Sequence, residues 1–198
     1  MCRLLPRVIL LNLCFAASAL AQSDQHPNGI GVYFDSQATI VSATVPVDES
    51  FALYLILTNP SAPGGVAGWE LAFHCACQNL FLLGYSFAGD GVNICDPWPD
   101  ICVGIPPPPL PRAETIVLMT LNFYVLTDAC VEYTLTPVEY PSLPGQMSYN
   151  DGADLFNLIP LHPSSGDVAL PVAALNCEGP PPIRAPKSSW GQTKALYR

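Results

Sequence analysis

Apolar and polar residues alternate along several short segments of the chain, a pattern typical of β-strands that bury one face. Segment 131–135 places Val131, Tyr133 and Leu135 on one face and polar residues on the other. Segment 114–127 alternates over a longer distance, and we expect one face of it to pack on a core. That face carries Val117, Met119, Leu121, Phe123 and Val125.

The other apolar segments fit the same interpretation. Segment 51–59 is apolar on both faces, which predicts a central strand. Segment 66–77 is expected to direct Glu70 and His74 outward and its alternate residues inward, namely Trp69, Leu71, Phe73, Cys75 and Cys77. Further strands are predicted at 29–35, 38–45, 80–87 and 167–175. No segment shows a helical period, so the pattern predicts an all-β, antiparallel β-sandwich.

Proline tracts divide the chain into parts. We expect a flexible start at 22–28, a β-sandwich domain at 29–177, a proline-rich linker at 178–187 and a C-terminal tail at 188–198. Inside the domain, segment 104–112 contains consecutive prolines, which cannot donate hydrogen bonds to a sheet. This tract is predicted to be a stiff connecting loop or edge, the alternative being a ligand for a proline-reading domain.

The first 21 residues have the features of a signal peptide. Arg3 and Arg7 precede an apolar run at 8–20, which is shorter than the about 20 residues that span a bilayer. The small residues Ala19 and Ala21 predict cleavage before Gln22. The alternative is an uncleaved anchor. No later segment is expected to insert into a membrane, so the protein is predicted to be secreted, periplasmic or at the cell surface.

The charge is strongly negative and unevenly distributed. The formal net charge is −9 at pH 7. Between the predicted cleavage site and residue 182, Arg112 is the single basic residue besides histidine. Nucleic acids and anionic membrane surfaces are themselves negative, so neither is an expected partner.

Six of the eight cysteines lie beyond the predicted signal peptide: Cys75, Cys77, Cys95, Cys102, Cys130 and Cys177. An even number in an exported protein predicts disulfides. We expect Cys95 to pair with Cys102, whereas Cys75 and Cys77 share one face of a regular strand and should bond elsewhere more readily than to each other. The alternative is a zinc site at His74, Cys75, Cys77 and Cys95.

No arrangement of residues in the sequence identifies a catalytic site. The histidines outside the signal peptide are His26, His74 and His162. His162 lies close in sequence to Ser164 and Ser165, but the nucleophile-elbow motif of serine hydrolases is absent. The acidic residues are scattered, without the carboxylate pair that glycoside hydrolysis requires. The chain is therefore predicted not to be an enzyme, and a secreted hydrolase is the least favoured alternative.

Two loops collect oxygen-bearing side chains of the kind that calcium binds. The first carries Asp90, Asn93, Asp96 and Asp100, and the second carries Asn150, Asp151 and Asp154. Neither matches the EF-hand loop, and Asp, Asn and Gly are also common in ordinary turns. No cofactor is predicted, and calcium remains the alternative at these loops.

Exposed aromatic rings are the residues that would bind a polysaccharide. Trp98 lies between two prolines in the loop that Cys95 and Cys102 would close. Tyr140 and Tyr149 flank a turn and are the other candidate ligand contacts. A sugar platform needs several rings in one plane, so carbohydrate binding is the second of the predicted functions.

Segments 48–75 and 116–126 resemble, in this order, strands of cohesin domains and of related carbohydrate-binding β-sandwiches. In the first, "GVAGWELAF" has the small-residue opening followed by alternating apolar positions. In the second, "IVLMTLNFYVL" has the apolar-x-apolar pattern of a later strand. The resemblance extends over residues 29–177. This chain departs from cohesins in its many cysteines, and the matching residues are core positions that transfer no site.

The resemblance implies a cohesin-like jelly roll that serves as a binding module. Cohesins hold a dockerin on a partner protein through one sheet face, and their relatives hold polysaccharide through exposed aromatic rings. We therefore expect a secreted, non-catalytic binding or structural module that mediates protein–protein contact in an extracellular or cell-surface assembly. The alternative is a carbohydrate-binding module.

The tail at 188–198 is basic, in contrast to the acidic domain. Ser188 or Ser189 could cap a short helix that places Trp190, Thr193 and Tyr197 on one face, beside Lys194 and Arg198. A helix this short is marginal in water and should order only on a partner. Trp190, Lys194, Tyr197 and Arg198 are therefore candidate recognition residues for sorting or docking. The alternatives are docking on the acidic domain itself and no role.

Overall fold

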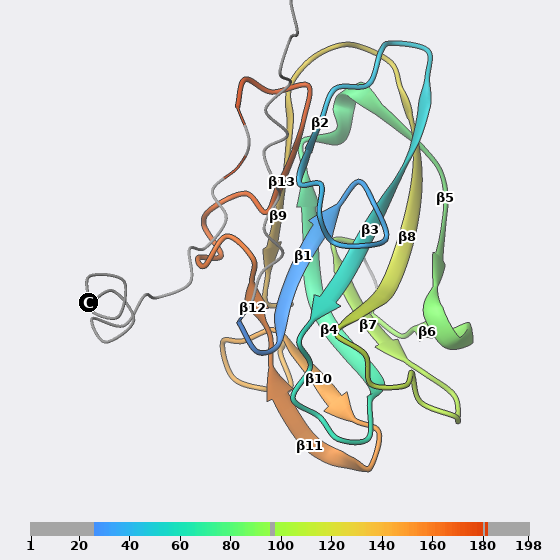
Figure 1. Cartoon of the computed structure of the whole chain (residues 1–198), viewed down its shortest axis with the longest axis vertical. Coiled ribbons are helices and arrows are strands. Elements are labelled where there is room, and N and C mark those ends of the chain that lie inside the picture. The colour runs from blue at the N-terminus through green and yellow to red at the C-terminus, as the bar shows by residue number, and fades with distance from the viewer. Residues whose placement is uncertain (1–25, 96–97, 180, 182–198) are drawn as a thin grey trace, which may run out of the picture.

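The computed structural model describes residues 26–95, 98–179 and 181. Within these ranges the chain forms thirteen strands and two single-turn 3₁₀ helices, and Figure 1 shows them arranged as two stacked sheets. The predicted signal peptide and the tail at 188–198 lie outside the described residues. No helix in the described ranges has both the length and the hydrophobicity to cross a membrane.

The elements follow one another as β1 (Gly29–Tyr33), β2 (Ser42–Ala43), β3 (Ser50–Thr58), β4 (Val66–Cys75), η1 (Cys77–Asn79), β5 (Leu80–Phe87), η2 (Ala88–Asp90), β6 (Val92–Asn93), β7 (Asp100–Gly104), β8 (Thr115–Val125), β9 (Val131–Thr136), β10 (Ser148–Asp151), β11 (Asp154–Pro160), β12 (His162–Pro163) and β13 (Ala173–Leu175). The prediction of an all-β sandwich is confirmed.

One sheet has five strands in the order β12-β1-β3-β8-β5. Strand β3 lies between β1 and β8, as its apolar character on both faces predicts. Strand β12 pairs in parallel with β1, while the other pairings in this sheet are antiparallel. Strand β5 forms one edge of the sheet (Figure 1).

The second sheet has eight strands and is centred on β4. Ala72 of β4 pairs with both β7 and β9, so these two strands occupy opposite sides of β4. Gly68 pairs with both β7 and β10, which places β10 on the same side as β9. Strand β4 thus has β9 and β10 along one side and β7 along the other, with β6 beyond β7 and β11 beyond β10.

The core lies between the sheets and contains the inward residues predicted for β9 and most of those predicted for β4 and β8. Val117 is an exception. Met119 pairs with Leu55 and Val117 with Ile56, which leaves an extra residue, Leu118, in β8. Because of this β-bulge, alternation counted from the residues after Leu118 gives the wrong face for the residues before it. Val117 therefore packs with Tyr54 on a small second cluster that includes Ile56, and the prediction for this residue was wrong.

The six cysteines form three disulfides: Cys75–Cys77, Cys95–Cys102 and Cys130–Cys177. The predicted Cys95–Cys102 pair is confirmed. The expectation that Cys75 and Cys77 bond elsewhere was wrong, because β4 ends at Cys75 instead of continuing. Ala76 turns the chain into η1 and brings the Cα atoms of the two cysteines to 5.0 Å. The three cysteines of the proposed zinc set, Cys75, Cys77 and Cys95, are all in disulfides and offer no thiolate to a metal, so that alternative does not apply.

Candidate functional site

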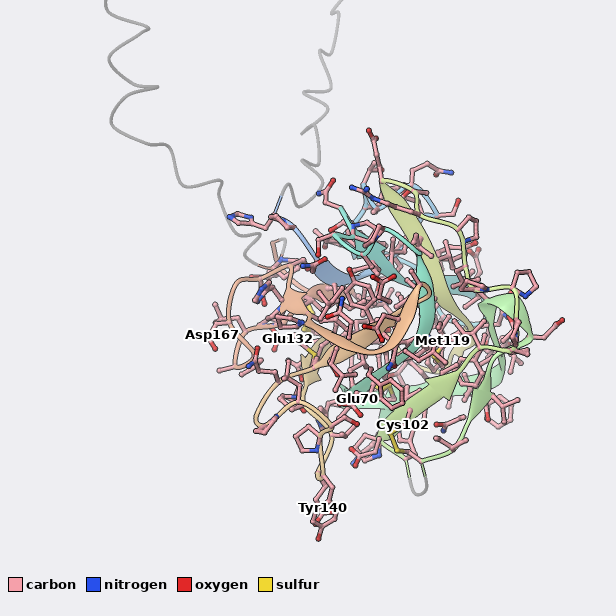
Figure 2. All side chains as sticks on the ribbon, turned by 90° about the horizontal axis from the view of Figure 1, so that it is seen from below. Glu70, Cys102, Met119, Glu132, Tyr140 and Asp167 are labelled. Atoms are coloured by element: carbon pink, nitrogen blue, oxygen red, sulfur yellow. A yellow bond between two sulfur atoms is a disulfide. The ribbon has the colours of Figure 1, made fainter. Side chains whose placement is uncertain are left out.

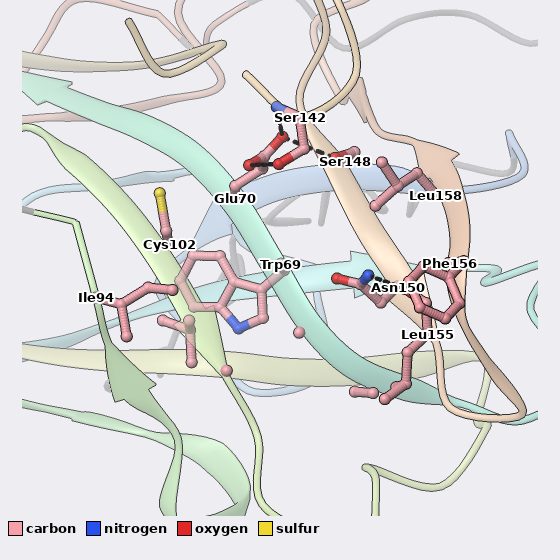
Figure 3. A pocket seen from close by; sticks show the side chains of 14 residues that line it. Trp69, Glu70, Ile94, Cys102, Ser142, Ser148, Asn150, Leu155, Phe156 and Leu158 are labelled. Carbon is pink, nitrogen blue, oxygen red and sulfur yellow. Dashed lines mark hydrogen bonds between the residues drawn. The ribbon is translucent and has the colours of Figure 1, made fainter. Parts of the chain in front are cut away.

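The outer face of the eight-stranded sheet contains a groove whose floor lacks side chains. Gly68 of β4 pairs directly with Gly104 of β7, so two glycines stand side by side in neighbouring strands. The same row continues outward through Asn150 of β10 and Leu158 of β11. A hollow of 440 Å³ lies over this row and is shown in Figure 3. We call it the Gly68–Gly104 groove.

The two glycines have different roles. A Cβ atom on Gly68 would lie 2.8 Å from the carbonyl oxygen of Val103, so the close packing of β4 on β7 requires glycine at this position. A Cβ atom on Gly104 would meet no atom within 4 Å. Gly104 therefore leaves space that the fold does not need, and this space is part of the groove.

Apolar side chains form the two walls. Ile94, after β6, is 79% exposed on one side of the groove. Leu155 and Phe156 of β11 are 62% and 96% exposed on the other side. Figure 3 shows Ile94 and Phe156 facing each other across the strands. Large apolar side chains on a solvent-exposed sheet face indicate a contact surface for another molecule.

Hydrogen bonds and a disulfide hold the walls in place. On the Ile94 side, Asn93 Oδ1 accepts hydrogen bonds from the backbone N–H groups of Cys95 (3.2 Å) and Cys102 (2.9 Å), which are also joined by their disulfide. On the Phe156 side, Asn150 Nδ2 donates to the carbonyl oxygen of Leu155 at 2.6 Å. Both walls are therefore fixed by contacts within the domain.

Glu70 closes one end of the groove. Its carboxylate accepts hydrogen bonds from the backbone N–H of Ser142 (2.7 Å), the Ser142 hydroxyl (2.8 Å) and the Ser148 hydroxyl (2.9 Å). These bonds fasten the loop before β10 to the sheet (Figure 3). Glu70 also brings a negative charge to an otherwise uncharged lining.

The three predicted aromatic contacts do not form one platform. Trp98 is 47% exposed, and its ring packs edge-on against buried Phe73 at a centroid distance of 5.7 Å. Tyr140 is 85% exposed and projects from the body of the domain in Figure 2. A hydrogen bond to the side chain of Glu139 raises the pKa of Tyr140.

Tyr149 is fully buried, so its predicted role as a surface contact was wrong. Its hydroxyl donates to Asn28 Oδ1 (2.8 Å) and accepts from the backbone N–H groups of Ser61 (3.1 Å) and Ala62 (3.2 Å). In β10 the side chain of Tyr149 points into the core, while those of its neighbours Ser148 and Asn150 line the groove.

The two loops considered for calcium use their oxygens within the fold. Asp151 Oδ1 accepts from the backbone N–H groups of Gly64 (2.9 Å) and Ala153 (3.0 Å), which fixes the β10–β11 turn. Asp100 Oδ2 accepts from the N–H of Glu139 at 3.0 Å. In the described ranges, no group of three or more His, Cys, Asp or Glu residues could hold a metal ion. Asp96 lies outside these ranges.

Two of the residues considered for catalysis, His74 and Ser165, bond to other groups. His74 Nε2 is 2.8 Å from the Thr136 hydroxyl. The Ser165 hydroxyl donates to the carbonyl oxygens of Asp167 (2.9 Å) and Leu170 (3.2 Å) and not to His162. The arrangement around Ser165 therefore lacks the contact between nucleophile and base that acyl transfer needs.

Comparisons with known proteins identify the fold. No protein-family profile matches the chain, and no curated protein matches it. A type II cohesin domain from the cellulosome of Acetivibrio cellulolyticus superposes with a TM-score of 0.52 and 12% identity, covering 75% of this chain and 94% of the cohesin. The sixth cohesin of scaffoldin B from the same organism, solved with a Cel5 dockerin, gives a TM-score of 0.51 and 12% identity, with 76% and 99% covered.

The class of protein that the fold defines is therefore a cohesin-like β-sandwich, and the predicted fold is confirmed. At 12% identity the likeness establishes the architecture and not the ligand. The groove was not predicted from the sequence, because it depends on the pairing of Gly68 with Gly104. The glycine inside the apolar strand pattern of 66–75 was the available signal, since such a glycine often marks a close approach to a strand.

Proposed function

We propose that this chain is a non-catalytic module that binds another protein through the Gly68–Gly104 groove. The observation that carries this proposal is a hollow formed by rigid strands, with an uncovered glycine floor and exposed apolar walls. Protein partners typically place an apolar or aromatic anchor in a preformed pocket of this kind. One structural neighbour, the scaffoldin B cohesin, is itself solved in complex with a dockerin, which supports the assignment to a binding module.

The lining of the groove favours a partner with an apolar anchor and a nearby hydrogen-bond donor or positive charge. The anchor would lie over Gly68 and Gly104, between Ile94 and Phe156. The donor or positive charge would lie near Glu70 at the end of the groove. Preformed walls lower the entropy cost of binding, because few side chains must be ordered when the partner arrives.

Export of the protein is part of the proposal. The predicted signal peptide supports export from the cytoplasm, and the three disulfides are compatible with an oxidising compartment. We place the module in a secreted, periplasmic or cell-surface assembly.

Capture from the secreted proteins of the producing organism tests the proposal. Wild-type protein, Gly104→Leu and Gly84→Leu are immobilised, and retained proteins are identified by mass spectrometry. Gly104→Leu fills the groove, whereas Gly84→Leu is a matched control, because a Cβ atom at either position meets nothing within 4 Å. We expect one protein to be retained by wild type and Gly84→Leu and lost with Gly104→Leu.

Carbohydrate binding is tested in parallel on insoluble polysaccharide. Retention that is lost in Trp98→Ala, without any protein partner, would replace the proposed function by a carbohydrate-binding one. A protein partner that binds Gly104→Leu as well as wild type would show that the groove is not the docking site.

A further inference from the structure

The sheet edges in the described part of the chain differ in how they are protected against pairing with another chain. An edge strand offers unpaired backbone groups, and proteins usually shorten it or place charges or prolines on it. Strands β2, β6 and β12 have two residues each, and β12 contains Pro163. Strand β11 is longer, but it begins with Asp154 and ends with Pro160.

Strand β5 has none of these sequence protections. It is eight residues long, with the sequence LFLLGYSF, and contains neither charge nor proline. It pairs with β8 on one side and lies at the end of the five-stranded sheet. Its side chains are unusually exposed for apolar residues: Phe81 59%, Leu82 38%, Leu83 55% and Tyr85 53%.

We propose that β5 pairs with β5 of a second copy of this chain, in antiparallel orientation, to give a continuous ten-stranded sheet. A strand that is apolar and uncharged along its length is complementary to itself about a two-fold axis. The charge of the chain favours β5 over other surfaces as the contact between two copies. The net charge of −9 makes two copies repel each other over most of their area. At β5 no carboxylate would face another.

The geometry limits the assembly to two copies. A two-fold contact uses the β5 edge of both partners, and the far edge of each five-stranded sheet is the short, proline-containing β12. The β-bulge between Leu82 and Gly84 adds local twist, which disfavours the flat stacking of many strands. A closed dimer follows instead of a fibre.

The available area predicts a weak dimer. The four exposed side chains present on the order of 400 Å² of surface per copy if each exposes ~200 Å² when free. Two copies would then bury at most about 800 Å² of side-chain surface, below the about 1,200 Å² at which stable specific interfaces begin, before the paired backbone is added. We expect a dissociation constant of the order of micromolar to tens of micromolar.

Dimerisation through β5 would leave the proposed binding site open. No residue of β5 lines the Gly68–Gly104 groove, which lies on the other sheet. One dimer would therefore offer two copies of the groove and increase the avidity for a partner that carries repeated binding segments.

Sedimentation equilibrium of the full exported chain over a range of concentrations tests the proposal. Wild type should convert reversibly from monomer to dimer. Leu83→Lys and Tyr85→Lys, each adding a charge at an exposed position of β5, should remain monomeric with unchanged thermal stability. Val168→Lys is the control, because Val168 is 41% exposed, lies between β12 and β13 and should not affect dimerisation.

The outcomes separate this inference from the proposed function. A monomeric wild type at all concentrations, or a dimer that persists in both lysine variants of β5, would overturn it. If the variants lose thermal stability, hydrogen–deuterium exchange of folded wild type at low and high concentration decides: slower amide exchange in β5 at high concentration supports the pairing, and unchanged exchange in β5 contradicts it. Neither result depends on whether a partner binds the groove.

Discussion

Replacing Tyr149 by Phe tests whether this residue is a structural part of the core. The change removes one buried hydroxyl and keeps the ring. In the wild type that hydroxyl bonds to Asn28 and to the backbone N–H groups of Ser61 and Ala62. Asn28 Oδ1 also accepts from Ser61 N–H at 2.7 Å, so Ser61 keeps a partner in the variant. Ala62, which is fully buried, loses the hydrogen bond to its N–H.

The expected cost follows from this orphaned donor. Leaving a buried donor without an acceptor costs about 1–3 kcal/mol of the free energy of unfolding. For a domain of this size, each kcal/mol lowers the melting temperature by about 2–4 °C, so we expect a fall of about 2–12 °C. Thermal and urea unfolding, followed by circular dichroism, measure the change. Tyr140→Phe is the control, because Tyr140 is 85% exposed and should change stability by less than about 0.5 kcal/mol.

Two results would refute the reasoning. Equal stability of Tyr149→Phe and wild type would show that the hydroxyl network contributes nothing to folding. Reduced ligand binding by a fully stable Tyr149→Phe would restore Tyr149 as a contact residue.

The remaining predictions concern the disulfides, an acid-sensitive loop and the tail. Denatured, unreduced exported protein, without residues 1–21, should not react with a thiol probe. Replacing both Cys130 and Cys177 by Ser should lower the free energy of unfolding by about 2–4 kcal/mol. Replacing Cys75 and Cys77 should cost less, because only two positions separate them in the sequence. A reactive pair of thiols would contradict full pairing. Burial opposes ionisation of Asp35, but hydrogen bonds from Thr39 and from the backbone of Ile40 outweigh it and lower the pKa of this carboxyl. The contribution of the Asp35 carboxylate to stability should therefore be present at neutral pH and disappear as the pH falls through that lowered pKa. The melting temperatures of wild type and Asp35→Asn should differ at pH 7 and converge in acid. A difference that stays constant with pH would contradict this role of Asp35. Deleting residues 188–198 should leave the melting temperature unchanged and impair export or surface retention; unchanged location would exclude an address, and lower stability would indicate docking on the domain.

The alternation of apolar residues was sufficient to predict the class of fold and the inward residues of β9. It was insufficient at Val117, because the bulge at Leu118 changes the parity of β8 and leaves no mark in the sequence pattern. Period-two arguments assume a regular strand. The Cys75–Cys77 disulfide was not predicted for the same reason, because β4 ends at Cys75 and the argument assumed that the strand continues regularly to Cys77.

The Gly68–Gly104 groove was harder to predict than the fold. Segment 150–154 combines Asn, Asp and Gly, which favour both calcium loops and tight turns, and only the backbone contacts of Asp151 distinguish the two. The strands on either side of this turn contain the groove wall and the buried Tyr149. The groove itself depends on the register that sets Gly68 opposite Gly104, and one sequence does not reveal which strands pair.

Hydrogen–deuterium exchange of the module, with and without its captured protein partner, tests the central claim most directly. Binding in the Gly68–Gly104 groove predicts slower amide exchange in β7 and β11, with β5 unchanged. Protection confined to β5, with β7 and β11 exchanging as in the free protein, would contradict it.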